Sequence, residues 1–143
     1  IAVGLSGDAC SSALLYFLKK LTSNRRDIRI SAISIDEGIA GYRSLKESGR
    51  IAALLQTESI TGSFLESFGK RLDEIAETKG NTVSCTYCRV MRNFLLNRIA
   101  RENGVTKIAF GTTLDNAAGS ILKHFLSGLP EMNAGSHLLE GGD

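Results

Sequence analysis

The chain has 143 residues and a mass of 15.4 kDa, which suits one domain and is too short for two of ordinary size. Hydrophobic residues make up 43% and charged residues 22%, a balance that excludes a disordered chain because it supplies enough apolar material for a core. The formal net charge of +2 neither demands nor excludes a nucleic-acid partner, and no apolar run approaches the roughly 18 residues of a membrane span.

Three cysteines without a secretory signal argue against a disulfide scaffold and favour a reducing, cytoplasmic compartment. The chain opens on an apolar run without Met, which is typical of a fragment. Two basic segments, at residues 19–26 and 89–101, are either solvated helix faces or parts of a nucleic-acid surface.

Strands and helices alternate along the chain. The predicted elements are a strand at 1–5, a helix at 12–21, a strand at 28–35, a helix at 43–55, a strand at 57–61, a broken helix at 65–77, a loop at 79–83, a helix at 87–103, a strand at 107–110 and a helix at 114–126. The residues predicted to face the core on the last two helices are Val90, Met91, Phe94, Leu95, Ile99 and Ala100, then Ile121, Leu122 and Phe125. This alternation predicts an α/β fold with a parallel sheet covered by helices on both faces. We expect one domain over 1–128 and a poorly ordered, Gly-rich tail over 129–143.

Ligands of open parallel sheets bind outside the carboxyl ends of the strands. Three predicted loops fall there, at residues 6–12, 36–41 and 111–116. The first reads Ser6-Gly7-Asp8-Ala9-Cys10-Ser11-Ser12 and offers hydroxyls, backbone N–H groups and a helix N-terminus to an anion. A capped helix start explains the same residues, so this loop alone leaves both interpretations open.

The first loop resembles the PP-loop of the ATP pyrophosphatases, whose usual form is S-G-G-x-D-S. Ser6, Gly7 and Ser11 match, whereas Asp8 stands at the second Gly and Cys10 at the Asp. Four further segments resemble the tRNA 2-thiolation branch of that superfamily, in the same order and at similar spacing. Residues 35–43 resemble V-D-E-G-I-x-G-Y-R, 68–75 a related stretch, 85–92 C-x-Y-C-G-x-x-[RK], and 111–118 G-H-N-L-D-D-E-A.

The resemblance implies a PP-loop, Rossmann-like fold and ATP-dependent synthesis of 2-thiouridine in tRNA. The enzyme would adenylate the C2 oxygen of a tRNA uridine, release pyrophosphate, and let a sulfur donor displace AMP, with Mg²⁺ neutralising the phosphates. The family expectation for the donor is a ubiquitin-like thiocarboxylate protein, and for the assembly a homodimer.

Members of this family hold an iron–sulfur cluster on three cysteines, so the resemblance implies Cys85 and Cys88 as ligands. The third ligand is absent from this chain, as are the zinc modules that relatives carry at both ends. Two thiolates at i and i+3 can reach one metal centre, and a helix N-terminus beside Arg89 and Arg92 would lower the pKa of both thiols. Two reduced cysteines or a zinc half-site remain the alternatives.

The resemblance also assigns roles to other residues. The phosphate cradle would be Ser6, Gly7, Ser11 and Ser12, and the adenine would lie against Ile33, Ser34, Ile35 and Asp36, with Gly111 also at the nucleotide. Arg92 would lie near phosphates or substrate, and Asp115 near Mg²⁺. An exposed helix charge and a helix N-terminal residue favoured by the dipole are the alternatives for these two.

The departures from the family pattern favour weakened ATP chemistry or an altered substrate. Asp8 brings a negative charge into a phosphate site, where repulsion would cost on the order of a few kcal/mol. Further replacements are Cys10, Thr112, Thr113, Asn116 and Ala117. The alternative function is therefore a non-catalytic PP-loop-like module that binds nucleotide or tRNA. Another ATP pyrophosphatase does not explain the Cys85–Cys88 pair, and a simple redox or zinc protein does not explain residues 36–43.

Overall fold

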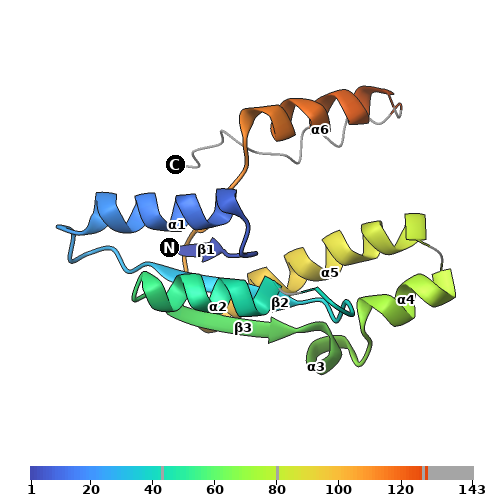
Figure 1. The fold of residues 1–143 in the computed structure, drawn as a ribbon, viewed down its shortest axis with the longest axis horizontal. Coiled ribbons are helices and arrows are strands. Elements are labelled where there is room, and N and C mark those ends of the chain that lie inside the picture. Colours follow the sequence, from blue (N-terminus) through green and yellow to red (C-terminus); the bar gives the residue numbers. More distant parts are fainter. Residues whose placement is uncertain (43, 80, 127, 129–143) are drawn as a thin grey trace. The chain divides into compact units, whose positions relative to one another are not determined.

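The structure is a computed structural model that describes residues 1–42, 44–79, 81–126 and 128 (Figure 1). The chain divides into two compact units, Ile1–Gly111 and Thr112–Asp143, which are described separately. The predicted tail at 129–143 lies outside the described residues. The predicted domain at 1–128 spans parts of both units and stays a prediction.

The first unit is built on a parallel sheet of four strands. The strands are β1 (Ala2–Gly4), β2 (Ser31–Asp36), β3 (Glu58–Ser63) and β4 (Ile108–Phe110). Their order in the sheet is β3-β2-β1-β4, with Ala2 paired to Ser31 on one side and to Ile108 on the other. The chain therefore moves outward from β1 through β2 to β3 and returns to the opposite side for β4. This reversal creates a topological switch point beside β1, where α/β proteins bind ligands.

Helices cover both faces of this sheet, as predicted (Figure 1). On one face α1 (Ala9–Thr22) and α2 (Ser44–Leu54) cover the strands, and on the other lie α3 (Phe64–Phe68), α4 (Leu72–Lys79) and α5 (Asn81–Glu102). Neighbouring residues of β1 face opposite sides of the sheet. Ala2 packs with α5 in one hydrophobic cluster, and Val3 packs with α1 in the other. Burial on both faces holds for β1 and β2 in the middle of the sheet, whereas the edge strand β3 is largely exposed.

The predicted broken helix at 65–77 is two helices, α3 and α4, separated around Gly69. Gly69 has φ of 69°, and its N–H donates to the carbonyl of Leu65 at 2.9 Å. This left-handed conformation ends α3, since a side chain is disfavoured there.

The predicted loop at 79–83 is wrong in its larger part. α5 begins at Asn81, six residues before the predicted start, so Cys85 and Cys88 lie inside the helix. Cys88 is about two turns from the helix start, whereas the helix dipole acts mainly within the first turn. The expected effect of a helix N-terminus on this thiol therefore does not apply.

The predicted core face of α5 is correct only in part. Leu95, Ile99 and Ala100 are buried as expected, and Leu96 joins them. Val90 and Phe94 are exposed, because the stripe facing the sheet follows the C-terminal half of the helix. α5 also packs along α4.

In the second unit, α6 spans Leu114–Leu126, the predicted bounds. Its apolar residues Ile121, Leu122 and Phe125 are exposed rather than directed inward. α6 is the only helix or strand that the structure describes in this unit, so no other described element of the unit covers that face. Among the described residues of both units, no helix combines the length and hydropathy that a membrane span requires.

Candidate functional site

A cavity of about 300 Å³ opens at the carboxyl ends of β1, β2 and β4. Its lining residues are Gly4, Leu5, Ser6, Asp8, Ser11, Ile33, Ile35, Glu37, Tyr42, Arg92, Asn93, Leu96, Phe110 and Gly111. The position coincides with the topological switch point, and the volume is at the lower end for small-molecule pockets. The cavity combines apolar walls with a few polar groups, which is typical of ligand sites.

The turn between β1 and α1 contributes the main polar groups of the cavity. Asp8 is the N-cap of α1: its Oδ1 accepts from the Ser11 N–H at 2.7 Å. Its Oδ2 accepts from the Ser6 hydroxyl, also at 2.7 Å. The Ser6 and Ser11 hydroxyl oxygens lie 3.1 Å apart. These contacts lower the pKa of the Asp8 carboxyl, the Ser11 backbone N–H being the largest cause.

This cap explains why α1 begins at Ala9 rather than at the predicted residue 12, because Asp is among the best N-cap residues. Gly7 has φ of 83°, which a glycine adopts at no steric cost. The Ser12 hydroxyl donates to the Asp8 carbonyl, and Ser12 does not belong to the described lining of the cavity. Both sequence interpretations of this loop therefore apply to the same residues: it is a capped helix start, and its hydroxyls line a cavity.

Gly111 fixes this turn against the end of β4. A Cβ at Gly111 would lie 2.5 Å from the carbonyl carbon and oxygen of Cys10 and 2.6 Å from the Ser11 nitrogen. These are backbone atoms that have little freedom to move away, so only glycine fits. The close approach holds the first turn of α1 at the rim of the cavity.

Some residues at the end of β2 line the cavity, and others make hydrogen bonds elsewhere. Ile33 and Ile35 line the cavity, whereas Ser34 points the other way and donates to the Leu5 carbonyl at 2.9 Å. Asp36 accepts from the Gly38 N–H at 2.9 Å, which closes the turn after the strand. Of the four residues expected at the adenine, the structure thus brings two to the cavity, since successive strand side chains alternate in direction.

The cavity wall opposite the turn carries an ion pair. Arg92 Nη2 lies 2.8 Å from Glu37 Oε1, and the Glu37 side chain is only 7% exposed against 46% for Arg92. The same nitrogen donates to the sulfur of Cys88 at 3.2 Å. Sequence reasoning missed the role of Glu37, although its place directly after a buried strand was the available signal. Tyr42 and Phe110 were missed as well.

Comparison with known proteins relates this fold and site to tRNA modification. No protein-family model matches the chain. Among curated proteins, cytoplasmic tRNA 2-thiolation protein 1 of Aspergillus niger is 31% identical over 99% of this chain and 42% of its own length. The proteins of the same name from Kluyveromyces lactis and Xenopus laevis are 37% and 33% identical, each over 90% of this chain and over 35% and 38% of their own lengths.

Among solved structures, the U34-tRNA thiolase NcsA of Methanococcus maripaludis, determined with its 4Fe–4S cluster, matches with a TM-score of 0.80 and 29% identity. The match covers 89% of this chain and 42% of NcsA. Over nearly its whole length, the chain is thus related to part of the tRNA 2-thiolation proteins. The chain spans less than half the length of these tRNA 2-thiolation proteins. The resemblance drawn from the sequence motifs and the predicted α/β fold are both confirmed.

The cysteine pair of this chain is described only in part. Cys88 is half-buried on α5, and the side chain of Cys85 lies outside the described part of the structure. Within that part, no group of three or more His, Cys, Asp or Glu residues is placed to hold a metal. Cys88 is the only expected cluster ligand whose side chain the structure describes, so the described residues do not form a complete cluster site. The roles of Cys85 and Cys88 stay predictions.

Asp115 belongs to the second unit, in the first turn of α6. Its helix begins after Thr113, whose hydroxyl accepts from the Asn116 N–H at 3.2 Å. Thr113 therefore supplies the cap, and the dipole of α6 favours Asp115 at this position. The role of Asp115 near Mg²⁺ stays a prediction.

In the first unit, some of the predicted site residues line the cavity and others do not. Those that line the cavity are Ser6, Ser11, Ile33, Ile35, Arg92 and Gly111. Those outside its described lining are Gly7, Ser12, Ser34, Asp36 and Cys88. Residues from four separate segments of the sequence thus meet at one rim of the sheet.

Proposed function

We propose that this chain is the nucleotide-binding core of a cytoplasmic, ATP-dependent tRNA 2-thiolation enzyme. One observation carries the proposal: in a chain related to tRNA 2-thiolation proteins, the PP-loop-like turn, the end of β2 and Arg92 meet at one cavity at the switch point. The reaction would adenylate a tRNA uridine with release of pyrophosphate, after which a sulfur donor displaces AMP.

In this proposal, different residues of the cavity bind the phosphates and the adenine. The Ser6 and Ser11 hydroxyls bind phosphate, together with the backbone of Gly7 in the same turn. The apolar side chains of Ile33 and Ile35 contact the adenine. Arg92 stabilises negative charge that develops on the leaving pyrophosphate, as fixed cations do in nucleotidyl transfer. By the family resemblance, Asp115 in the second unit is proposed to lie near Mg²⁺.

The sulfur chemistry is assigned to the cysteine pair. We infer that Cys85 and Cys88 supply two ligands of an iron–sulfur cluster, which would carry sulfur when bound, with the remaining ligand coming from outside this sequence. The partners proposed are tRNA and a sulfur donor, such as a ubiquitin-like thiocarboxylate protein, and the proposed assembly is a homodimer. NcsA, the structural neighbour that holds a 4Fe–4S cluster, supports the cofactor assignment.

A second candidate function is a PP-loop-like module that binds nucleotide or tRNA without turnover. The contacts of Asp8 favour it, because this carboxylate already accepts from two donors that a phosphate group would need. Under this candidate the chain retains the fold and the cavity but not the adenylation step.

The test begins with calorimetry of ATP and AMP in the presence of Mg²⁺. Anaerobic reconstitution with iron and sulfide follows, and then incubation with tRNA, ATP and sulfide and mass spectrometry of the tRNA nucleosides. Under the first candidate we expect tRNA-dependent release of pyrophosphate from ATP with the unmodified chain, because adenylation does not need the cluster. Once an added thiol supplies the remaining cluster ligand, we expect 2-thiouridine, its loss in Cys85→Ala and Cys88→Ala, and its retention in the control Cys10→Ala. ATP binding without tRNA-dependent pyrophosphate release would favour the second candidate, and no nucleotide binding at all would contradict both.

A further inference from the structure

The charge on the cavity wall is unusual for a site expected to hold phosphates. Two carboxylates line it, Asp8 and Glu37, and the lining contains a single basic side chain, Arg92, among the residues that the structure describes. Arg92 is already paired with Glu37 at 2.8 Å. The phosphate end therefore depends on the donors of the turn between β1 and α1.

Those donors are engaged by Asp8. Its two carboxylate oxygens accept from the Ser11 N–H and the Ser6 hydroxyl, both at 2.7 Å. Hydrogen bonds to an ionised carboxylate are shorter and about twice as strong as neutral ones. The lowered pKa of Asp8 agrees with this geometry, because the turn stabilises the charged form.

The sequence predicted only that the charge of Asp8 would repel phosphate. In the structure, its carboxylate also occupies the donors that a phosphate group would use. The carboxylate satisfies the helix N-terminus as a bound anion would, since such termini favour negative charge and offer N–H groups. Gly111, packed against the backbone of Cys10 and Ser11, leaves the turn little room to rearrange. A phosphate group must therefore break the Asp8 contacts before it gains the same donors.

We propose that Asp8 is a specificity-determining residue of this cavity: it occupies the Ser6 and Ser11 donors as an internal anion and disfavours highly charged phosphate ligands relative to a neutral nucleoside. This inference rests on the proposed function, because it takes the cavity to be the nucleotide site. A nucleoside contacts the Ile33 and Ile35 wall and needs none of these donors. A divalent cation that arrives with the phosphates would relieve the repulsion, because it offsets the carboxylate charge.

The test compares Asp8→Asn with the unmodified chain by calorimetry, with adenosine, AMP and inorganic pyrophosphate as probes. Asn retains the size and the capping ability of Asp but carries no charge. We expect pyrophosphate to bind about tenfold more tightly to Asp8→Asn, AMP to change less, and adenosine to stay within about twofold. Unchanged or weaker pyrophosphate binding would overturn the inference.

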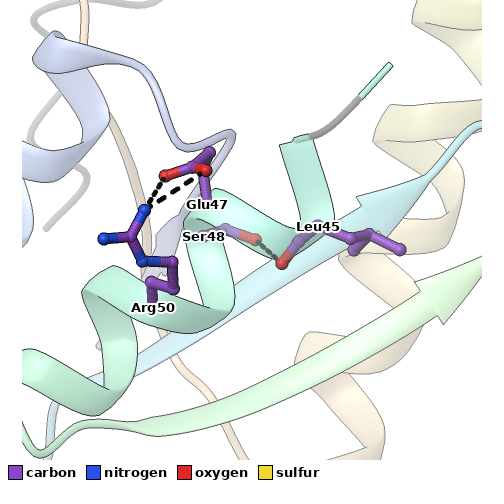
Figure 2. A network of polar contacts seen from close by, with 4 residues as sticks. All are labelled: Leu45, Glu47, Ser48 and Arg50. Atoms are coloured by element: carbon purple, nitrogen blue, oxygen red, sulfur yellow. Dashed lines mark hydrogen bonds and ion pairs between the residues drawn. The ribbon is translucent and has the colours of Figure 1, made fainter. Parts of the chain in front are cut away.

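Glu47→Gln is the matched control, because it also removes one acidic charge. Glu47 lies on α2, pairs with Arg50 at 3.2 Å across the helix surface, and is not part of the described cavity lining (Figure 2). We expect its pyrophosphate affinity to equal that of the unmodified chain. An increase matching that of Asp8→Asn would show a general charge effect and overturn the inference.

Two further comparisons distinguish a failure of this inference from a failure of the proposed function. Asp8→Ser, another neutral N-cap residue, repeats the test if Asp8→Asn does not fold, as judged by circular dichroism. Adenosine binding with unchanged pyrophosphate affinity in both variants overturns the role of Asp8 and leaves the nucleotide site in place. If the unmodified chain and the variants bind neither adenosine nor pyrophosphate, the proposed function and this inference fail together.

Discussion

Arg92 joins two elements that are distant in the sequence, because its Nη2 lies 2.8 Å from Oε1 of Glu37 at the end of β2. The Glu37 backbone carbonyl also accepts from the Leu72 N–H at 2.9 Å, at the start of α4. The Glu37 side chain is nearly buried, and a buried carboxylate needs a partner for its charge. This ion pair therefore stabilises the cavity wall and also supplies charged groups to it.

Arg92→Ala should lower the free energy of unfolding by about 1–3 kcal/mol, because it leaves Glu37 buried without its cation. The value falls below that of a fully buried pair since Arg92 is 46% exposed and water reaches it. Urea unfolding followed by circular dichroism measures the change. The control Arg50→Ala breaks the exposed pair with Glu47 and should cost less than about 1 kcal/mol (Figure 2). Equal losses in the two variants would contradict the role assigned to Glu37.

Gly111→Ala should destabilise the chain by about 1–3 kcal/mol and weaken adenosine binding, because the added methyl group meets the backbone of Cys10 and Ser11. Gly49→Ala is the matched control. Gly49 lies inside α2, and a Cβ there has no neighbour within 4 Å. That variant should gain about 0.5–1 kcal/mol, since Ala favours helix more than Gly does. Thermal unfolding and calorimetry measure both effects, and a neutral Gly111→Ala would show that the turn is free to shift.

The pH dependence of stability should report the Asp8 cap. The pKa of Asp8 lies below its ordinary value of 3.8 in the folded chain, mainly because of the Ser11 N–H. Its contribution to stability is therefore fully present above that ordinary value and is lost as the pH falls through the lowered folded-state pKa. Asp8→Asn should be less stable than the unmodified chain at pH 6, and the difference should shrink towards pH 3.

Comparing the two chains isolates Asp8 from other carboxylates, such as Asp27, whose pKa is also lowered by its contact with Arg25. Urea unfolding at several pH values gives the difference in the free energy of unfolding. A difference that does not change between about pH 6 and pH 3 would mean that the carboxylate charge adds nothing to the cap.

The fold could be predicted from the sequence because β1 and β4 are short apolar runs and most segments between the strands carry apolar residues at helical spacing. The start of α5 could not, since residues 81–86 are mostly polar and show no apolar periodicity. Ser, Thr and Asn favour caps and turns in isolation, so the packing of α5 against α4 outweighs their local preference.

The site was predicted where local rules decide it. Ser6, Ser11 and Gly111 follow strands whose carboxyl ends meet, and the topology brings them together. Glu37 was missed because its position after a buried strand indicates only the rim of the sheet, whereas its importance comes from a tertiary contact with Arg92. The alternation of strand side chains would have separated Ile33 and Ile35 from Ser34 and Asp36.

Two substitutions on α5 test which side of the helix faces the sheet. Leu95 is 1% exposed and Val90 is 59% exposed, although the sequence pattern had assigned both to the core. Leu95→Ala should lower the free energy of unfolding by about 2–5 kcal/mol, because it leaves a cavity between α5 and the sheet. Val90→Ala should change it by less than about 1 kcal/mol, since it removes little buried surface and Ala favours helix. Urea unfolding of both variants decides the matter, and similar losses would mean that the N-terminal half of α5 is buried against a surface that the described residues do not provide.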